Sequence, residues 1–114
     1  MGLEYRIRPL DVQWFAQNRD RVAETVRTLP SFVEEKPGDE FWLKHSASDS
    51  SWAFDVRVFI EDDSLFVEIS SNSGAFYEDV RALYERLAQD AGAVVEDADD
   101  PDETVEPSRL FQRP

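Results

Sequence analysis

The sequence contains no cysteine and only one histidine, His45. Without cysteine the chain has no disulfide, no thiolate metal ligand and no cysteine nucleophile. A single imidazole also excludes any metal site that needs two histidines from one chain. Hydrophobic runs are short, and none approaches the ~20 residues of a membrane-spanning helix. We therefore expect no metal site, no cofactor and no membrane contact.

Basic residues are scarce as well. Twelve bases face 25 acids, which gives a net charge of −13 and a pI near 4.3. Nucleic acids and anionic membranes bind clusters of Lys and Arg, so we expect neither as a partner. Two interpretations of the acidity stay open: general solubility, as in a salt-adapted protein, or attraction to a basic partner. The N-terminus lacks the apolar core of a signal peptide, which favours a cytoplasmic location.

A chain of 114 residues fits one compact domain. We expect a single α+β domain over 1–95 and an acidic, flexible C-terminal tail over 96–114. Residues 96–106 contain seven acids and no base. Such a segment buries too little apolar area to offset the entropy of ordering it.

Residues 3–9 alternate between apolar and charged side chains, which predicts a strand with one buried face. A helix over 11–29 follows, with an aspartate as its N-cap. Arg19 falls within the apolar stripe of this helix, and Trp14 falls roughly opposite the stripe. Either the helix is interrupted near Asn18, or both side chains are placed there for a reason.

Three further strands are predicted by alternation of period two, over 41–45, 52–60 and 65–70. In the middle one we expect a buried face made by Trp52, Phe54, Val56, Val58 and Ile60. A two-residue turn at 62–63 joins the last two strands. In that register Phe59 opposes Phe66, and Arg57 opposes Glu68, on the outer face. A slip by one residue would turn every apolar side chain to the wrong face.

A second helix is predicted from a cap at Asn72 or Ser73 to about Ala91, and residues 93–95 suit a short edge strand. The element order β-α-β-β-β-α predicts an α+β fold with one antiparallel-rich, four-stranded sheet and two helices on one face. The charges of the first strand favour placing it beside the strand that carries Glu68. The alternative is a ferredoxin-like sandwich with a short fifth strand.

The outer face of this sheet has an unusual composition. A face that meets water should be polar, yet this one carries aromatic residues among charges, as interfaces do. The candidate interaction residues are Trp42, Arg57, Phe59, Phe66 and Glu68, with Trp14 of the first helix as a separate contact. Two alternatives to an interface stay open: aromatic residues simply favour strands, or Leu110 and Phe111 of the tail cover them.

Motifs for catalysis are missing from the sequence. It has no nucleophile elbow, no phosphate-binding loop and no EF-hand spacing. We therefore expect a non-enzymatic interaction protein of the inhibitor, immunity-type, chaperone or adaptor kind, which binds a basic protein or a second copy of itself. The alternative is a ligand-binding or catalytic domain with a pocket near His45, Trp52 and Tyr84. A third possibility is a salt-adapted domain whose charge serves hydration.

Overall fold

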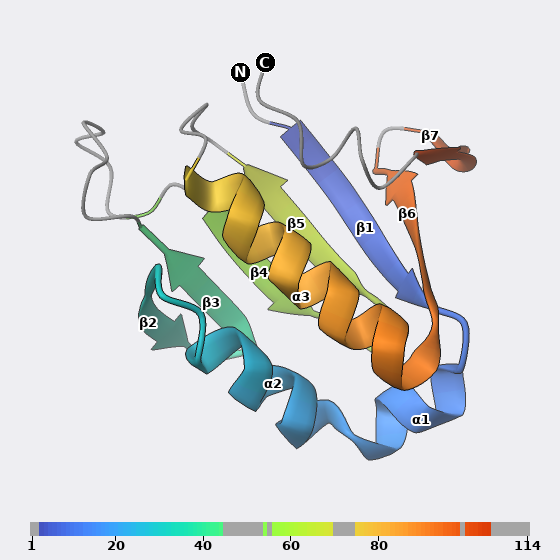
Figure 1. The fold of residues 1–114 in the computed structure, drawn as a ribbon, viewed down its shortest axis with the longest axis horizontal. Helices are drawn as coiled ribbons and strands as arrows, with labels where there is room; N and C mark the ends of the chain where they lie inside the picture. The colour runs from blue at the N-terminus through green and yellow to red at the C-terminus, as the bar shows by residue number, and fades with distance from the viewer. Residues whose placement is uncertain (1–2, 45–53, 55, 70–74, 99, 106–114) are drawn as a thin grey trace.

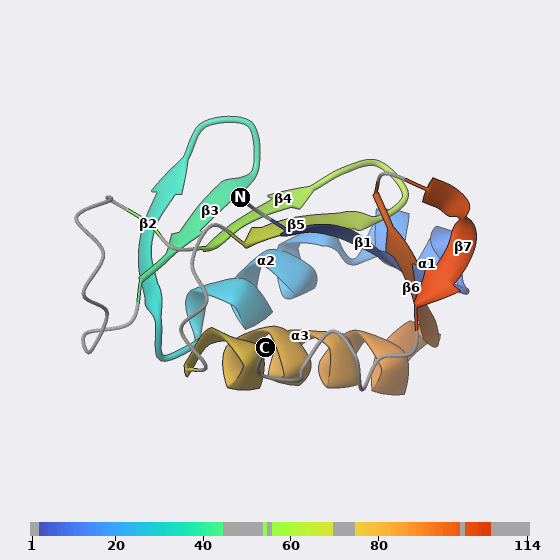
Figure 2. The same ribbon diagram turned by 90° about the horizontal axis from the view of Figure 1, so that it is seen from above.

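The computed structural model describes residues 3–44, 54, 56–69, 75–98 and 100–105. In chain order its elements are β1 (Leu3–Pro9), α1 (Val12–Gln17), α2 (Arg19–Arg27), β2 (Phe32–Lys36), β3 (Glu40–Leu43), β4 (Val56–Ile60), β5 (Leu65–Ile69), α3 (Ala75–Ala91), β6 (Ala93–Asp97) and β7 (Asp100–Val105). The strands form one open antiparallel sheet in the order β2-β3-β4-β5-β1-β6-β7. The helices α2 and α3 lie on one face of this sheet (Figures 1 and 2).

The predicted α+β class is confirmed, but the prediction of four strands was wrong. The additional strands are β2 and β7. The short strand predicted over 93–95 is present as β6, but it lies between β1 and β7 rather than at the edge of the sheet. The sequence pattern missed β2 because a register shift between Phe32 and Glu34 breaks the two-residue alternation. If β2, β3 and β7 are left out and α1 and α2 are taken together, the elements run β-α-β-β-α-β. This is the element order of the ferredoxin-like alternative, within a wider sheet.

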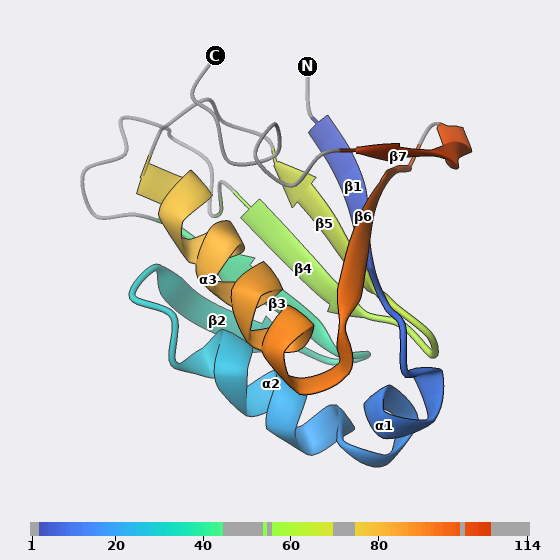
Figure 3. The ribbon, with the colours of Figure 1, turned by 45° about the vertical axis from the view of Figure 1, so that its right-hand side comes forward.

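The end of β6 and the whole of β7 lie in the segment that we expected to be a tail. β6 continues to Asp97, and β7 pairs with β6 at the edge of the sheet (Figure 3). The backbone N–H of Ala98 also donates to the carbonyl of Glu4 at 3.1 Å. Strand pairing orders a backbone without apolar side chains, and composition does not reveal it. Residues 106–114, the rest of the expected tail, lie outside the described residues.

The predicted β4–β5 register is confirmed. Phe59 opposes Phe66, and Arg57 opposes Glu68. The position of β1 beside β5 is also confirmed. The basis for that position was only partly right, because Arg6 opposes Phe66 rather than Glu68.

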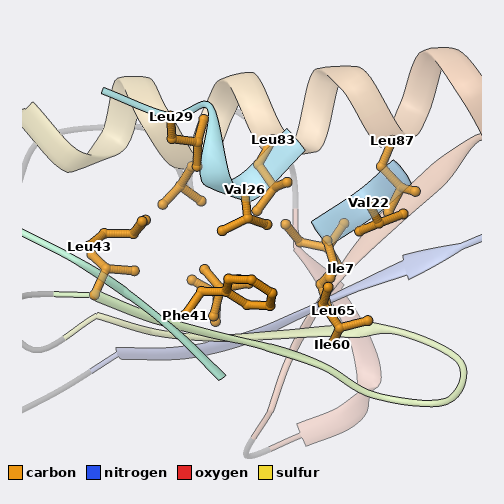
Figure 4. Packing of buried hydrophobic residues seen from close by; sticks show 14 of the residues in the cluster. Ile7, Val22, Val26, Leu29, Phe41, Leu43, Ile60, Leu65, Leu83 and Leu87 are labelled. Carbon is orange, nitrogen blue, oxygen red and sulfur yellow. The ribbon is translucent and has the colours of Figure 1, made fainter. Parts of the chain in front are cut away.

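The hydrophobic core lies between the inner face of the sheet and the two long helices. Figure 4 shows side chains of the helical layer pointing toward those of the strands. Val22 and Val26 of α2, Leu29 just after it, and Leu83 and Leu87 of α3 face Ile7, Phe41, Leu43 and Leu65 of the strands. The largest fully buried side chains are Phe15 and Phe41. Apolar side chains at helical spacing on α2 and α3, and at every second residue on β4 and β5, therefore meet in one cluster.

The first predicted helix is broken at Asn18, as one of our two alternatives required. Asn18 has φ −122° and separates α1 from α2. Its side-chain amide donates to the carbonyl of Trp14 at 2.8 Å, which satisfies a carbonyl at the end of α1. The break makes Arg19 the first residue of α2.

Arg19 joins α2 to two turns of the sheet. Its guanidinium donates to the carbonyl of Glu61 at 2.5 Å and to that of Ile60 at 3.0 Å. It also forms an ion pair with Asp39 at 2.9 Å. A charged side chain in the apolar stripe is thus explained by main-chain acceptors at the end of β4.

Replacing Arg19 with methionine should lower the free energy of unfolding by about 2 kcal/mol, because two main-chain acceptors lose a charged donor. Urea unfolding measures this difference. Arg21→Met is the matched control, since Arg21 is exposed and has no ion-pair partner within the described part of the chain. The control should change stability by less than ~0.5 kcal/mol. Equal losses in both variants would contradict the role of Arg19.

Candidate interaction surface

The sheet face turned away from α2 and α3 carries the candidate surface (Figure 2). Strand register brings five of the six predicted interaction residues onto this face: Trp42, Arg57, Phe59, Phe66 and Glu68. Trp14 is not among them. It is half-buried, packs against the core from α1 and lies in the helical layer.

Seven side chains form a continuous row across this face. We call these side chains the outer row; in order they are Lys36, Trp42, Phe54, Arg57, Phe59, Phe66 and Arg6. At the β2 end the Nζ of Lys36 lies 4.4 Å from the centroid of the Trp42 ring. The Trp42 ring is 4.8 Å from that of Phe54, between centroids. Both contacts lie in the range of favourable ring packing and cation–π attraction.

Arg57 occupies the middle of the outer row. Its Cζ lies 4.7 Å from the ring centroid of Phe54 and 5.4 Å from that of Phe59. Its Nη2 forms an ion pair with Glu68 at 2.6 Å, and its Nη1 lies 3.8 Å from Glu40. One guanidinium thus contacts two rings and two carboxylates.

The outer row ends on β5 and β1. The rings of Phe59 and Phe66 meet edge to face at 5.9 Å between centroids. Arg6 places its Cζ 5.5 Å from the Phe66 centroid and forms an ion pair with Glu61 at 3.1 Å. Each of the four rings therefore has a cation within 6 Å of its centroid.

These contacts distinguish the outer row from a bare aromatic patch. Trp42, Phe59 and Phe66 are each half-buried, whereas Leu10 is 67% exposed and Val33 is 54% exposed. Two rings lie between each cation of the outer row and the next, so the surface offers both apolar and charged contacts. Trp, Phe and Arg in such a mixture are typical of protein interfaces.

The sequence did not predict four contributors to this surface: Lys36, Glu40, Phe54 and Arg6. Phe54 was expected in the core but contacts Trp42 and Arg57. The regular strand β4 begins only at Val56, so alternation does not extend back to Phe54. For Arg6 a signal did exist, because alternation in residues 3–9 already placed its side chain on the outer face.

The predicted ligand pocket has only one described member. Tyr84 is half-buried on α3 and packs against the core. His45 and Trp52 lie outside the described residues. Within the described ranges, no group of three or more acidic or histidine side chains is arranged to hold a metal. None of the helices found there is long and apolar enough to cross a bilayer.

A separate ion pair joins α2 to β2. Arg27 donates from Nε to Glu35 Oε1 at 2.7 Å and from Nη2 to Oε2 at 3.1 Å. These hydrogen bonds lower the pKa of Glu35 below its ordinary value of 4.5 and raise the pKa of Arg27. The geometry is the bidentate one that suits a guanidinium and a carboxylate.

Acid titration should reveal this pair. The folded-state pKa of Glu35 is lowered, so its contribution to stability is present above the ordinary carboxyl pKa and is lost as the pH falls through the lowered value. A carbon-detected NMR titration should find the pKa of Glu35 below 4.5. Arg27→Gln should move that pKa back up. An unchanged pKa in the variant would contradict the assignment.

Comparison with known proteins adds no relative to this description. No family model matches the chain, and neither the search of curated proteins nor that of solved structures returned a match.

Proposed function

We propose that this chain is a small acidic, non-enzymatic interaction module that binds a basic protein through the outer sheet face. One observation carries the proposal: the outer row combines three cations and four aromatic rings on the face opposite the helices. A few residues supply most of the binding energy at protein interfaces, and tryptophan, tyrosine and arginine are enriched among them. An inhibitor, immunity-type protein, chaperone or adaptor would each use such a face.

The charge around the outer row supports a basic partner. Glu4 and Glu34 are exposed beside it, and Glu61 is half-buried at one end. The chain as a whole carries −13. Acids at the rim of an interface steer a cationic protein and raise its association rate, whereas the central rings supply affinity.

Affinity capture from native lysate at low and high salt tests this function. We expect one basic protein to bind at low salt and to weaken as salt screens the rim charges. A shortened chain that ends at Ala98 keeps β6 and lacks the acids of β7, so it should bind more slowly but still bind. Capture of no protein, or of proteins whose binding ignores salt, would contradict the proposal. A dimer of this chain at the same concentrations would favour a second copy as the partner.

A further inference from the structure

The helical side of the molecule, opposite the outer row, contains a groove. It lies between α2 and α3, which run side by side (Figures 1 and 3), and has a volume of about 350 Å³. Its lining residues are Arg21, Glu24, Thr25, Thr28, Leu29, Ala82 and Arg86. This volume is at the small end of the range for ligand pockets, which excludes large ligands such as dinucleotides.

The floor of the groove is apolar. Leu29 is buried beneath it, and Ala82 faces it from α3. A small cavity of about 10 Å³ shares the residues Thr25 and Arg86 and reaches Trp14. The smaller cavity is lined by the apolar side chains Trp14, Val22, Leu83 and Leu87, and the two cavities meet at Thr25 and Arg86.

The charged residues of this groove differ in whether they form ion pairs within the described part of the chain. The acid on the same wall, Glu24, forms an ion pair with Arg27 at 3.3 Å. On the other wall Arg86 binds Asp90 at 3.1 Å. Arg21 has no ion-pair partner within the described ranges, although acids outnumber bases 25 to 12 in the chain. Arg27 also pairs with Glu35, so it compensates the charge of Glu24 only in part. The guanidinium of Arg21, which has no such pair in the described ranges, suits an anion.

We propose that this groove binds a small organic monoanion with an apolar body, namely a medium-chain carboxylic acid. The carboxylate would pair with the guanidinium of Arg21, with Arg86 as a second donor, and the chain would cover Leu29 and Ala82. A single negative charge suits the site better than a phosphate, because the rest of the molecule repels a dianion more strongly. This site is independent of the outer row.

An NMR titration with octanoate tests the proposal. Saturable shifts should appear at the Trp14 indole, Thr25 and Ala82. Acetate, which lacks the apolar body, and octanol, which lacks the charge, should each bind about tenfold more weakly. Shifts that never saturate, or equal binding of all three compounds, would overturn the proposal.

Two variants with a matched control localise the site. Arg21→Gln should weaken octanoate binding about tenfold, because it removes the free cation. Ala82→Trp should fill the groove and abolish binding. Arg81→Gln removes the same charge from an exposed position of α3 where Arg81 pairs with Glu85, and it should leave binding unchanged. An equal loss in Arg21→Gln and Arg81→Gln would show that only general charge matters, and the site would be rejected.

Discussion

Replacing Phe59 and Phe66 together with threonine should weaken partner binding at least ~30-fold, the equivalent of ~2 kcal/mol. The two rings meet at 5.9 Å in the outer row and carry the cations Arg57 and Arg6 against them. Threonine keeps the preference for strands but removes both rings. Isothermal titration against the captured partner measures the loss.

The same substitutions also affect stability, since both rings are half-buried and contact each other. We expect the free energy of unfolding to fall by about 2 kcal/mol. Ile60→Val with Ile69→Val is the matched control, because these residues lie on the inner face of the same two strands and their truncation costs a similar amount. The control should bind as the unmodified chain does. If both double variants lose binding alike, stability rather than the outer row is responsible.

Replacing Asp79 with alanine should lower the free energy of unfolding by about 3 kcal/mol, because two buried donors of Ser31 lose their partner. Asp79 is 8% exposed, and its Oδ2 accepts hydrogen bonds from the backbone N–H of Ser31, at 3.0 Å, and from the Ser31 hydroxyl. These bonds tie α3 to the connection between α2 and β2. Chemical denaturation measures the change.

Three further variants grade this effect. Glu78→Ala changes the neighbouring acid in the first turn of α3 and should cost less than ~0.5 kcal/mol. Ser31→Ala removes only one donor and should cost about 1 kcal/mol. Asp79→Asn retains an acceptor of the same shape, so its loss of stability should lie between those of Ser31→Ala and Asp79→Ala. A loss in Asp79→Ala no larger than that in Glu78→Ala would refute the role of the carboxylate.

Strong local patterns made part of the fold predictable. The β4–β5 hairpin followed from the two-residue turn at 62–63 together with alternation, because a slip by one residue would expose its apolar side chains. The same register placed Phe59, Phe66, Arg57 and Glu68 on one face, so most of the candidate surface followed from the sequence too. The break at Asn18 was one of two alternatives left open, because Arg19 and Trp14 did not fit a single apolar stripe.

Other features depend on contacts that sequence patterns do not contain. The bulge at Phe32 hid β2, and hydrogen bonds to β6 order β7 despite its acidic composition. The cation–ring contacts of Lys36 and Arg6 join residues from different strands. The pairing of Asp79 with Ser31 across 48 positions is of the same kind. Long-range partners of this sort follow from the fold and not from local periodicity.

The most direct test of the outer row is site-specific photo-crosslinking in native lysate. A photoreactive phenylalanine analogue is introduced in place of Phe66, on the outer face, and separately in place of Arg81, on α3 on the other side of the molecule. We expect a crosslinked basic protein from position 66 and none from position 81. The same adduct from position 81 alone, or from both positions equally, would contradict an interface on the outer sheet face.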